Sequence, residues 1–571
     1  MEEKKLTGYP SIDKPWLKYY SEEAINAPLP EGSMYDFMCD CNKMRLSKPA
    51  LNYFGKKISH QQLRKNVDIC ARALAANGVK SGDFVDLCLL AVPEAVYLLY
   101  AVNRLGAICN FLVLSATEKD LHKQISLCGS KLLITMDMVE DKIANAIKDT
   151  AIEKVVTVSV SESMPAPLSA FMKLKSRKPG HLKTVSWKAF LNSGAKSKLP
   201  DHIAGDQDSA VVEYTGGTTG ESKGVLLSNQ AANALALHYL SAKTILHFQA
   251  GETFLDIIPP FLAYGLFFGI HMPLCVGTEC ILSPDPAPQN FPKLFYRYKP
   301  NHFAGGPLHI DNLIQQLSVK QLDLSFLTTA GFGGDAGNNE WEARASDYLK
   351  KNHAKYELIN GYGMTEVAGA FCTTSHEIRH MLPFAKNNVK IIDVDTGKEL
   401  PYGQEGEICI SGPTMMKEYF KNEEETSAAI WEENGVRWLH TGDLGYITEE
   451  GYFVISGRLK RIFYSVGSDN VVSRVYPMKI ESTICKCTHV DKCSVVGKPN
   501  GEKGYLPIAF VVLREGADKD MVIAELESVC KQELPEASWP YAYRIVDKLP
   551  TTPAGKVDFR ALEREAQNTE A

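Results

Sequence analysis

Short apolar runs alternate with amphipathic stretches along the first two thirds of the chain. Residues 61–79 (QQLRKNVDICARALAANGV) place apolar side chains at helical spacing, which predicts a helix that ends at Gly78. The run 84–90 (FVDLCLL) predicts a buried strand, and 93–106 predicts a helix that opens on a proline. Further strand-like runs occur at 131–136, 154–160, 279–283, 302–306 and 356–363. Strands that alternate with helices predict an α/β fold with a largely parallel sheet covered on both faces.

The pattern changes after about residue 400. Short strands separated by glycine turns predict an antiparallel β subdomain, at 406–412, 437–447 and 451–457. Beyond it, periodicity predicts a helix, two strands and another helix, at 478–487, 493–497, 507–513 and 520–534. We therefore expect two domains, 1–457 and 458–571. The first would contain stacked α/β subdomains and the β subdomain, and the second would be a small α+β domain.

Composition and charge exclude some functions. Of the 571 residues, 45% are hydrophobic, and the formal net charge is −6. This mild acidity argues against a nucleic-acid partner, because nucleic-acid-binding domains normally carry a basic surface. The N-terminal sequence lacks the apolar segment of a secretory signal peptide, so a cytoplasmic protein is expected. The best candidate for a membrane span, 257–277, contains three prolines, so a buried strand, a loop and a short helix are expected there instead.

Fourteen cysteines in a chain without a secretory signal predict reduced thiols that are mostly buried. Cys485, Cys487, His489 and Cys493 form one cluster, but zinc sites usually have two separated CxxC-type pairs. Ordinary packing at the junction of a helix and a strand is the favoured interpretation of this cluster. A structural metal is the alternative.

The first candidate site is a loop rich in glycine and threonine, Thr215–Gly224 (TGGTTGESKG). Glycines allow backbone N–H groups to approach phosphate oxygens, the threonine hydroxyls add donors, and Lys223 adds a positive charge. The loop is not the GxxxxGK[ST] motif, because Ser222 precedes Lys223 and a glycine follows it. A flexible glycine hairpin without a ligand is the alternative.

The second candidate is the turn at 360–366 (NGYGMTE), which follows a strand-like run. Thr365 and Glu366 would lie at the carboxyl end of a strand, where ligands of open α/β sheets bind. The carboxylate of Glu366 is the kind of hard oxygen ligand that Mg²⁺ prefers. A helix start capped by Thr365 explains the same residues without a ligand.

The third and fourth candidates lie nearer the C-terminus. Asp443 occupies a glycine-flanked turn (TGDLG), from which it could accept hydrogen bonds from two ribose hydroxyls, and Arg458 could donate to the same sugar or to phosphate. A plain turn residue is the alternative for Asp443. Lys556 lies on a loop stiffened by two prolines (LPTTPAGK), and it would be an ordinary solvated lysine if considered alone.

Together and in this order, these motifs resemble those of the adenylate-forming superfamily. That superfamily includes acyl- and aryl-CoA synthetases, adenylation domains of peptide synthetases and luciferases. The resemblance extends over about residues 30–565. It implies a large N-terminal domain and a small, mobile C-terminal lid, which rotates between two half-reactions.

The resemblance also implies a role for each matched position. The β- and γ-phosphates of ATP would be held by the first loop, at Thr215, Gly216, Gly217, Thr218, Thr219, Gly220 and Lys223. Adenine and the α-phosphate would be bound by the middle segments, at Gly333, Gly334, Asp335, Tyr362, Gly363 and Thr365. Glu366 would hold Mg²⁺, and Asp443 and Arg458 would hold the ribose. Lys460 would be the hinge of the lid and Lys556 its catalytic lysine.

Three departures from the family pattern bear on the second substrate. Ser222 stands where the family usually has proline, which removes no phosphate donor. Leu262 stands where many relatives have histidine and where amino-acid-activating relatives have aspartate. Because leucine cannot pair with an ammonium group, we expect an apolar acyl pocket around Phe261, Leu262 and Tyr264, with core packing as the alternative for each side chain. The segment after Arg458 is about five residues longer than usual.

The predicted function is the activation of a carboxylic acid, fatty or otherwise apolar, to an acyl-AMP, followed by transfer to coenzyme A. The reaction would use ATP and Mg²⁺. An acyl-AMP ligase that loads a carrier-protein thiol is the alternative, because the longer segment lies where relatives receive the thiol. A non-catalytic nucleotide-binding protein is disfavoured, since the candidate catalytic residues Thr365, Glu366 and Lys556 are all present. The sequence leaves the identity of the acid and the oligomeric state open.

Overall fold

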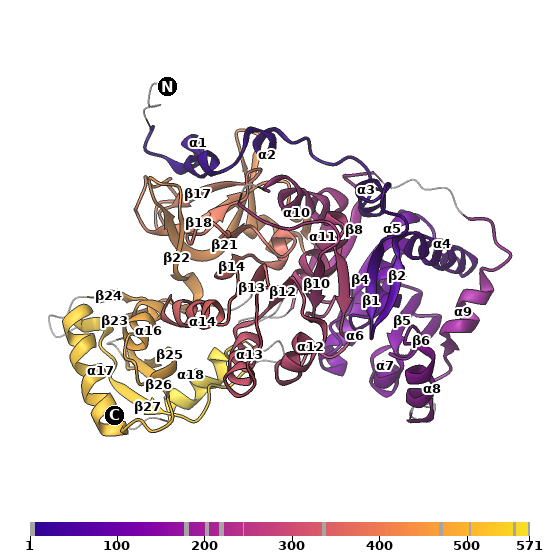
Figure 1. Ribbon diagram of the computed structural model, residues 1–571. Helices are drawn as coiled ribbons and strands as arrows, with labels where there is room; N and C mark the ends of the chain where they lie inside the picture. The colour runs from indigo at the N-terminus through magenta and orange to yellow at the C-terminus, as the bar shows by residue number, and fades with distance from the viewer. Residues whose placement is uncertain are drawn as a thin grey trace.

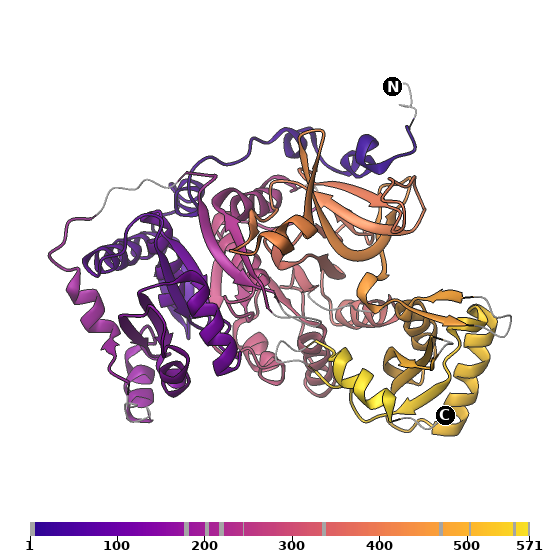
Figure 2. The ribbon, with the colours of Figure 1, turned by 180° about the vertical axis from the view of Figure 1, so that it is seen from behind.

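The computed structural model describes residues 6–175, 182–199, 205–215, 222–243, 245–333, 339–466, 472–501, 504–551 and 556–568. A large N-terminal domain of two α/β subdomains and a β subdomain is followed by a smaller α+β domain, the lid (Figure 1). Both ribbon views place the lid beside the β subdomain and away from the first α/β subdomain (Figure 2). The predicted fold class is confirmed.

The sheet of the first α/β subdomain has eight strands in the order β19-β9-β8-β4-β3-β5-β6-β7. Neighbours from β8 to β7 are parallel, whereas β9 and β19 add antiparallel pairs at one edge. The strands are β3 (Phe84–Cys88), β4 (Ile108–Phe111), β5 (Leu132–Met136), β6 (Lys154–Val158), β7 (Val185–Ser186), β8 (Ser209–Tyr214), β9 (Gly224–Ser228) and β19 (Glu418–Tyr419). Strands β3, β5 and β6 coincide with predicted apolar runs.

The second α/β subdomain contains a nine-stranded sheet in the order β16-β15-β14-β13-β12-β10-β11-β1-β2. Its neighbours from β14 to β1 are parallel, which confirms the expected largely parallel arrangement. The strands are β1 (Pro49–Tyr53), β2 (Lys56–Ser59), β10 (Thr253–Asp256), β11 (Glu279–Leu282), β12 (His302–Gly305), β13 (Thr329–Gly333), β14 (Leu358–Tyr362), β15 (Cys372–Thr373) and β16 (Leu382–Pro383).

Helices cover these sheets, and their ends follow local sequence signals. Helix α4 begins at a capping box in which Ser59 and Gln62 exchange hydrogen bonds, and α5 begins on Pro93. The helices of the N-terminal domain are α1 (Pro10–Asp13), α2 (Glu22–Asn26), α3 (Met34–Cys41), α4 (His60–Ala76), α5 (Pro93–Arg104), α6 (Glu118–Cys128), α7 (Glu140–Ala146), α8 (Ala166–Lys175), α9 (Trp187–Ser193), α10 (Asn229–Ser241), α11 (Met272–Val276), α12 (Phe291–Tyr298), α13 (Pro307–Val319), α14 (Asn339–Lys351) and α15 (Glu423–Ala429).

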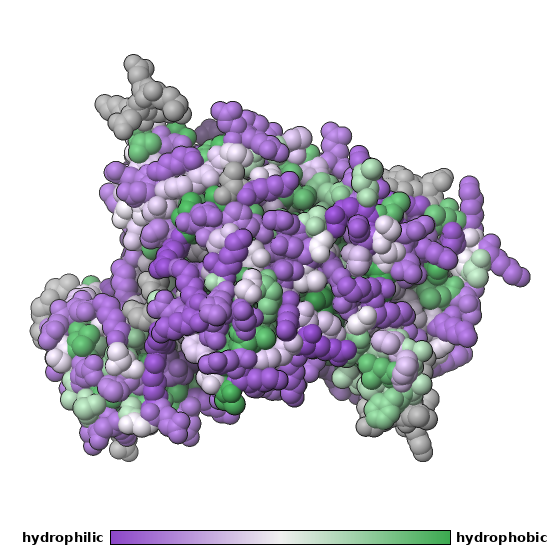
Figure 3. All heavy atoms as spheres, in the orientation of Figure 1, coloured by the Kyte–Doolittle hydropathy of each residue, from purple (hydrophilic) through white to green (hydrophobic). Residues whose placement is uncertain are grey.

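The uncharged segment 257–277 is part of the protein core. It contains the π-helical turn η3 (Tyr264–His271) and helix α11, and nearly all of its side chains are buried. Helix α10 packs against both η3 and α11. In addition, η3 contacts strand β10, and α11 contacts strand β11. Among the described residues, no helix is long and apolar enough to cross a membrane. The face shown in Figure 3 is mostly hydrophilic, with apolar residues in small separate groups.

The β subdomain is antiparallel, as the glycine-punctuated strands predicted. It comprises β17 (Asn388–Ile392), β18 (Gly406–Ser411), β20 (Ile430–Glu433), β21 (Val436–Ile447) and β22 (Phe453–Arg458). Strand β21 is central, because it pairs with β18, β20 and β22. It carries Asp443, so this sheet fixes one part of the candidate site.

The lid has its own hydrophobic cores, in which Cys487 and Cys530 are buried. Cys485 and Cys493 pack against the same core, as the packing interpretation of the cysteine cluster expects. Its elements are β23 (Phe463–Val466), β24 (Val472–Val475), α16 (Pro477–Cys485), β25 (Val490–Pro499), β26 (Tyr505–Leu513), α17 (Lys519–Glu533), β27 (Ala542–Ile545) and α18 (Phe559–Gln567). The segment after Arg458, expected from the sequence to be longer than the family pattern, contains the β23–β24 pair.

Candidate active site

The glycine- and threonine-rich loop joins β8 to β9, and its base is a closed hairpin. The Thr215 N–H donates to the Lys223 carbonyl oxygen (3.0 Å), and the Lys223 N–H donates to Thr215 Oγ1 (3.1 Å). Ser222 Oγ donates to the Thr215 carbonyl oxygen at 2.8 Å, so the serine that replaces the usual proline stabilises this base. The remaining predicted residues of the loop lie outside the described residues: Gly216, Gly217, Thr218, Thr219 and Gly220.

Lys223 is paired with a carboxylate in this structure. Its Nζ forms an ion pair with Glu425 of α15 and lies 4.4 Å from the ring centroid of Tyr419. The hydrogen bond from Lys223 holds the pKa of Glu425 below its ordinary value. A phosphate at Lys223 would therefore have to replace Glu425 as its partner.

The turn after β14 brings Glu366 against Tyr419. Thr365 and Glu366 begin the short 3₁₀ turn η5 (Thr365–Val367), and the Tyr419 hydroxyl donates to Glu366 Oε1 at 2.7 Å. Burial, reinforced by the charge of Glu366, raises the pKa of Tyr419, so the phenol stays protonated and remains a donor. Glu366 is 9% exposed, and one of its two oxygens is oriented by this contact.

The sequence did not point to Tyr419. It reaches Glu366 because β19 pairs with β9 in antiparallel register, with Tyr419 opposite Val225. This pairing joins strands far apart in the chain, and no local spacing or turn signal marks it. The same contact places the ring of Tyr419 between Glu366 and Lys223.

Two glycines let the Thr365–Glu366 turn approach the predicted acyl segment. A Cβ on Gly363 would lie 2.3 Å from the Gly369 carbonyl oxygen, so a side chain cannot be placed there. Gly369 has a φ of +89°, and a Cβ there would lie 2.9 Å from backbone atoms of Ala263 and Tyr264. The turn and the acyl segment therefore pack together without intervening side chains.

The three predicted acyl-pocket residues lie at one end of η3. Phe261 is buried, whereas Leu262 and Tyr264 are partly exposed. The Tyr264 ring stacks on Phe268 at a centroid distance of 5.3 Å. Its Cζ lies 3.8 Å from the position of a Cβ on Gly333, so the end of β13 reaches the same place. Two neighbouring predictions for the adenine site lie outside the described residues: Gly334 and Asp335.

The predicted ribose residues meet in one cluster. Asp443 is 2% exposed, and the Tyr362 hydroxyl donates to its Oδ2 at 2.7 Å. Arg458 faces Asp443 across the β21–β22 pair, with its Nε 2.8 Å from Oδ1. Oδ1 receives no hydrogen bond from the described residues, so it can accept one from a ligand hydroxyl. Burial raises the pKa of Asp443, and the charges of Arg458 and Lys556 oppose that rise.

Arg458 and Arg461, which precede and follow Lys460, make contacts with different domains. Arg458 pairs with Asp443 of the β subdomain, whereas Arg461 donates to the Val495 carbonyl oxygen at 3.2 Å and lies 4.0 Å from the ring of Phe559 in the lid. The chain between them forms the single turn η6 (Leu459–Arg461). This turn contains Lys460, the predicted hinge, and lies between the two anchors.

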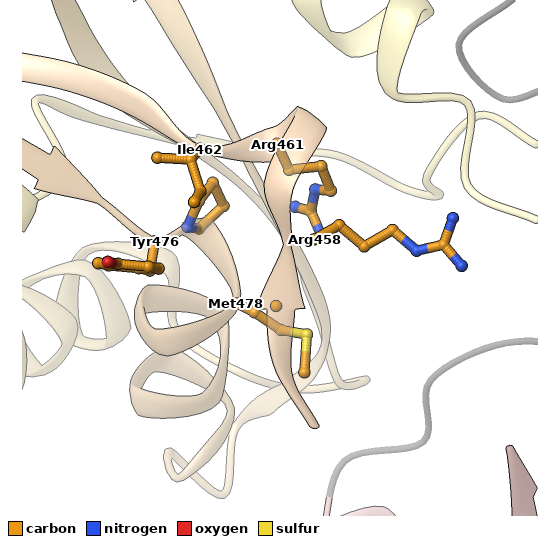
Figure 4. A pocket seen from close by; sticks show the side chains of 7 residues that line it. Arg458, Arg461, Ile462, Tyr476 and Met478 are labelled. Carbon is orange, nitrogen blue, oxygen red and sulfur yellow. The ribbon is translucent and has the colours of Figure 1, made fainter. Parts of the chain in front are cut away.

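A small hollow lies beside this joint (Figure 4). Figure 4 shows Arg458 extending away from the part of the hollow lined by Ile462, Tyr476 and Met478. The Arg458 side chain is 54% exposed, and it is paired with Asp443. Lys556 belongs to the lid, and its charge lowers the pKa of the same carboxylate, so in this lid orientation Lys556 acts on one of the predicted ribose residues.

The chain belongs to the AMP-binding enzymes, an adenylate-forming family. The family model described as AMP-binding enzyme matches residues 40–420, and the model of the AMP-binding enzyme C-terminal domain matches residues 479–556. Together with the curated CoA ligases described next, these matches confirm the predicted class, an AMP-forming acid–thiol ligase.

Two curated relatives show the range of the family around this chain. A long-chain-fatty-acid–CoA ligase of Bacillus subtilis is 29% identical over 570 residues, covering 97% of this chain and 99% of that protein. A probable 4-coumarate–CoA ligase 1 of Dictyostelium discoideum is 28% identical over 471 residues, covering 81% of this chain and 82% of that protein.

Solved structures establish the fold independently. The anthranilate CoA ligase AuaEII in complex with anthranoyl-AMP matches with a TM-score of 0.77 at 22% identity, covering 95% of this chain and 99% of that chain. ATP-bound MatB from Rhodopseudomonas palustris has a TM-score of 0.77 at 24% identity, covering 94% of this chain and 99% of that chain.

Proposed function

We propose that the protein joins an apolar carboxylic acid to AMP and then transfers the acyl group to coenzyme A. The observation that supports this most directly is the meeting of Tyr362, Asp443 and Arg458 with the charge of Lys556 from the lid. These groups can hold a sugar hydroxyl and place a cation beside the adjoining phosphate. Thr215 and Lys223 would hold the distal phosphates.

In the first half-reaction, a carboxylate oxygen of the acid attacks the α-phosphorus of ATP, and the bond to pyrophosphate breaks. The acid is already ionised at neutral pH, so no side chain has to remove a proton. The task of the protein is to bring two anions together and to stabilise the charge that develops between them. Thr365 would donate to the α-phosphate, and Lys556 would neutralise its charge.

Glu366 is suited to hold Mg²⁺. Its Oε1 is oriented by Tyr419, which leaves Oε2 for a hard cation, and Thr365 beside it can donate to phosphate. Bound there, Mg²⁺ would neutralise phosphate charge. Tyr419 is then a positioning residue, since it acts through Glu366.

In the second half-reaction, the thiol sulfur attacks the acyl carbon, AMP leaves, and the thiol proton passes to the AMP phosphate or to solvent. Lys556 has no task in this step and must give way to the thiol. We propose that the lid, residues 458–571, rotates about Lys460 relative to residues 1–457. The anchoring of Arg458 to one domain and of Arg461 to the other supports this joint.

We propose a fatty or other apolar acyl group. The described acyl segment offers the apolar side chains of Phe261 and Leu262 and no charge that could pair with an ammonium group. Relatives named for long-chain fatty acids and for 4-coumarate both fit an apolar acid. A carrier-protein thiol is the second candidate acceptor, because the β23–β24 hairpin lengthens the segment after the hinge.

One assay tests this proposal. The protein is incubated with ATP, Mg²⁺ and a panel of fatty, aromatic and amino acids, with and without coenzyme A, while pyrophosphate, AMP and the thiol are followed. We expect pyrophosphate release that requires an apolar acid and coenzyme A consumption equal to AMP formation. Adenylate formation without consumption of coenzyme A would favour the carrier-protein acceptor, and no acid-dependent pyrophosphate would refute adenylation.

Tyr419→Phe is expected to raise the half-saturating concentration of free Mg²⁺ by about tenfold, because a partner that orients a metal ligand is removed. The measurement is ATP–pyrophosphate exchange at fixed ATP. Tyr402→Phe is the matched control, because its hydroxyl donates to Asp13 at 3.0 Å, far from Glu366 in the fold. If both variants require the same concentration of Mg²⁺, Tyr419 does not position Glu366 for the metal.

A further inference from the structure

Three potential metal ligands meet in the β subdomain outside the residues assigned to catalysis. Glu407 and Cys409 project from the same face of β18, and His440 lies opposite Cys409 on β21. One ligand atom from each lies within 4.8 Å of the others, the only such group of three among the described parts of the chain. Two ligands at i and i+2 of one strand and a third from its neighbour can coordinate one ion on a sheet face.

The distances between these atoms are close to those of a metal centre. Cys409 Sγ lies 3.8 Å from His440 Nδ1, and Glu407 Oε2 lies 2.9 Å from the same nitrogen. Ligands of tetrahedral zinc, at bond lengths of about 2.0–2.3 Å, are separated by roughly 3.3–3.6 Å. Shifts of a few tenths of an ångström would therefore bring His440 Nδ1 to coordination distance from an ion shared with each of the other two atoms, and Glu407 and Cys409 offer ligand atoms within 4.8 Å of each other.

Surrounding groups hold the ligands in place. The Gly442 N–H donates to Glu407 Oε1 at 3.1 Å, which leaves Oε2 facing His440. The ring of Trp431 lies 4.3 Å from that of His440, and Trp438 packs with Cys409 in a small core. Supporting contacts of this kind orient the ligands of metal sites in proteins.

Charge and access also permit a cation. Lys390 is the nearby positive group, and its ammonium is already paired with Glu433 and Glu399. The His440 side chain is 35% exposed, which gives a path from solvent. Burial raises the pKa of the Cys409 thiol, so the metal has to displace its proton.

We propose that Glu407, Cys409 and His440 bind a borderline divalent cation of the zinc class, with a water as fourth ligand. The Cys409 S–H bond breaks, the thiolate forms a bond to the metal, and the proton passes to solvent. Sulfur and imidazole donors favour this class of ion over Mg²⁺. The site is separate from Glu366, and it does not depend on the proposed acyl transfer.

Cobalt(II) is the probe, because its bonds to thiolate give a charge-transfer absorption band. Chelator-treated protein is titrated with Co²⁺ alone, and Zn²⁺ is then added. We expect a band that Zn²⁺ abolishes, that is missing in Cys409→Ser, and that persists in Cys487→Ser, a buried cysteine of the lid. His440→Gln and Glu407→Gln should each weaken Co²⁺ binding by at least about tenfold.

Thermal unfolding of each variant shows whether it is folded. If Cys409→Ser does not fold, His440→Gln decides, because its side chain is partly exposed and its loss leaves the small core around Cys409 in place. No thiolate band in the wild-type protein, a band that survives in Cys409→Ser, or unchanged affinity in His440→Gln would each overturn the site. Co²⁺ absorption does not require turnover. The metal site can therefore be detected even if the protein does not transfer acyl groups, and the two proposals fail independently.

Discussion

Lys556→Ala is expected to slow acyl-adenylate formation by about 10²-fold or more, the usual cost of removing one group that stabilises charge in the transition state. The charge of Lys556 is one of those that oppose the raised pKa of Asp443, so the lysine is within electrostatic reach of the residue that would hold the ribose. The loss should fall on the rate of adenylation more than on the binding of ATP, because Thr215, Lys223, Asp443 and Arg458 remain.

The measurement is single-turnover formation of acyl-AMP from ATP and an accepted acid. Lys548→Ala is the matched control, because it removes an exposed lysine of the same domain without touching the candidate site. Synthetic acyl-AMP and coenzyme A should be converted by Lys556→Ala at an unchanged rate, since this lysine has no role in the second half-reaction. Full adenylation by Lys556→Ala would show that the lysine is assigned to the wrong step.

The elements that the sequence predicts well are those specified by local patterns. The helical spacing of 61–79 and the capping residue Ser59 define α4, and the mostly apolar run at 84–90, which contains Asp86 as its one charged residue, defines β3. Strands of parallel sheets buried on both faces consist of such nearly continuous apolar runs. Because local patterns specify the individual helices and strands, their order along the chain is sufficient to predict the fold class.

The contacts within the site are harder to predict from the sequence than the helices and strands are. Tyr362 and Asp443 are separated by 81 positions and meet because the end of β14 lies beside the middle of β21. The family resemblance assigned each of them, from a different motif, to the nucleotide, but neither their hydrogen bond nor the pairing of Lys223 with Glu425 follows from spacing. Tyr419 shows the same limit, because its role depends on the pairing of β19 with β9.

The structure explains the extra residues in the segment after Arg458. Its extra length predicted a departure from the family pattern and left a carrier-protein thiol open as the acceptor. The structure places it in the β23–β24 hairpin, where Arg474 donates to both carboxylate oxygens of Asp395 in the N-terminal domain, at 2.6 and 2.8 Å. This contact is one of several ion pairs between the lid and the N-terminal domain, together with Lys479–Glu405 and Lys492–Asp311, and the proposed rotation of the lid would have to break it.

Lys460→Pro is expected to have the opposite effect to the loss of Lys556. Lys460 lies in the 3₁₀ turn η6, whose helical φ is compatible with proline, so adenylation in the present orientation should continue. Rotation of the lid needs new dihedral angles at this turn. If proline makes them less accessible by about 3 kcal/mol, conversion of acyl-AMP and coenzyme A to acyl-CoA slows by about 10²-fold.

The measurement compares the two half-reactions separately, with Lys460→Ala as the matched control that removes the same charge and keeps the backbone free. We expect Lys460→Ala to carry out both steps and Lys460→Pro to accumulate acyl-AMP. Because Arg458 is held by Asp443 and Arg461 by the lid, no other turn between these anchors can absorb the rotation. Rapid acyl-CoA formation by Lys460→Pro would therefore show that the joint lies outside residues 459–461. A loss of both half-reactions would show that the present orientation of the lid also depends on Lys460.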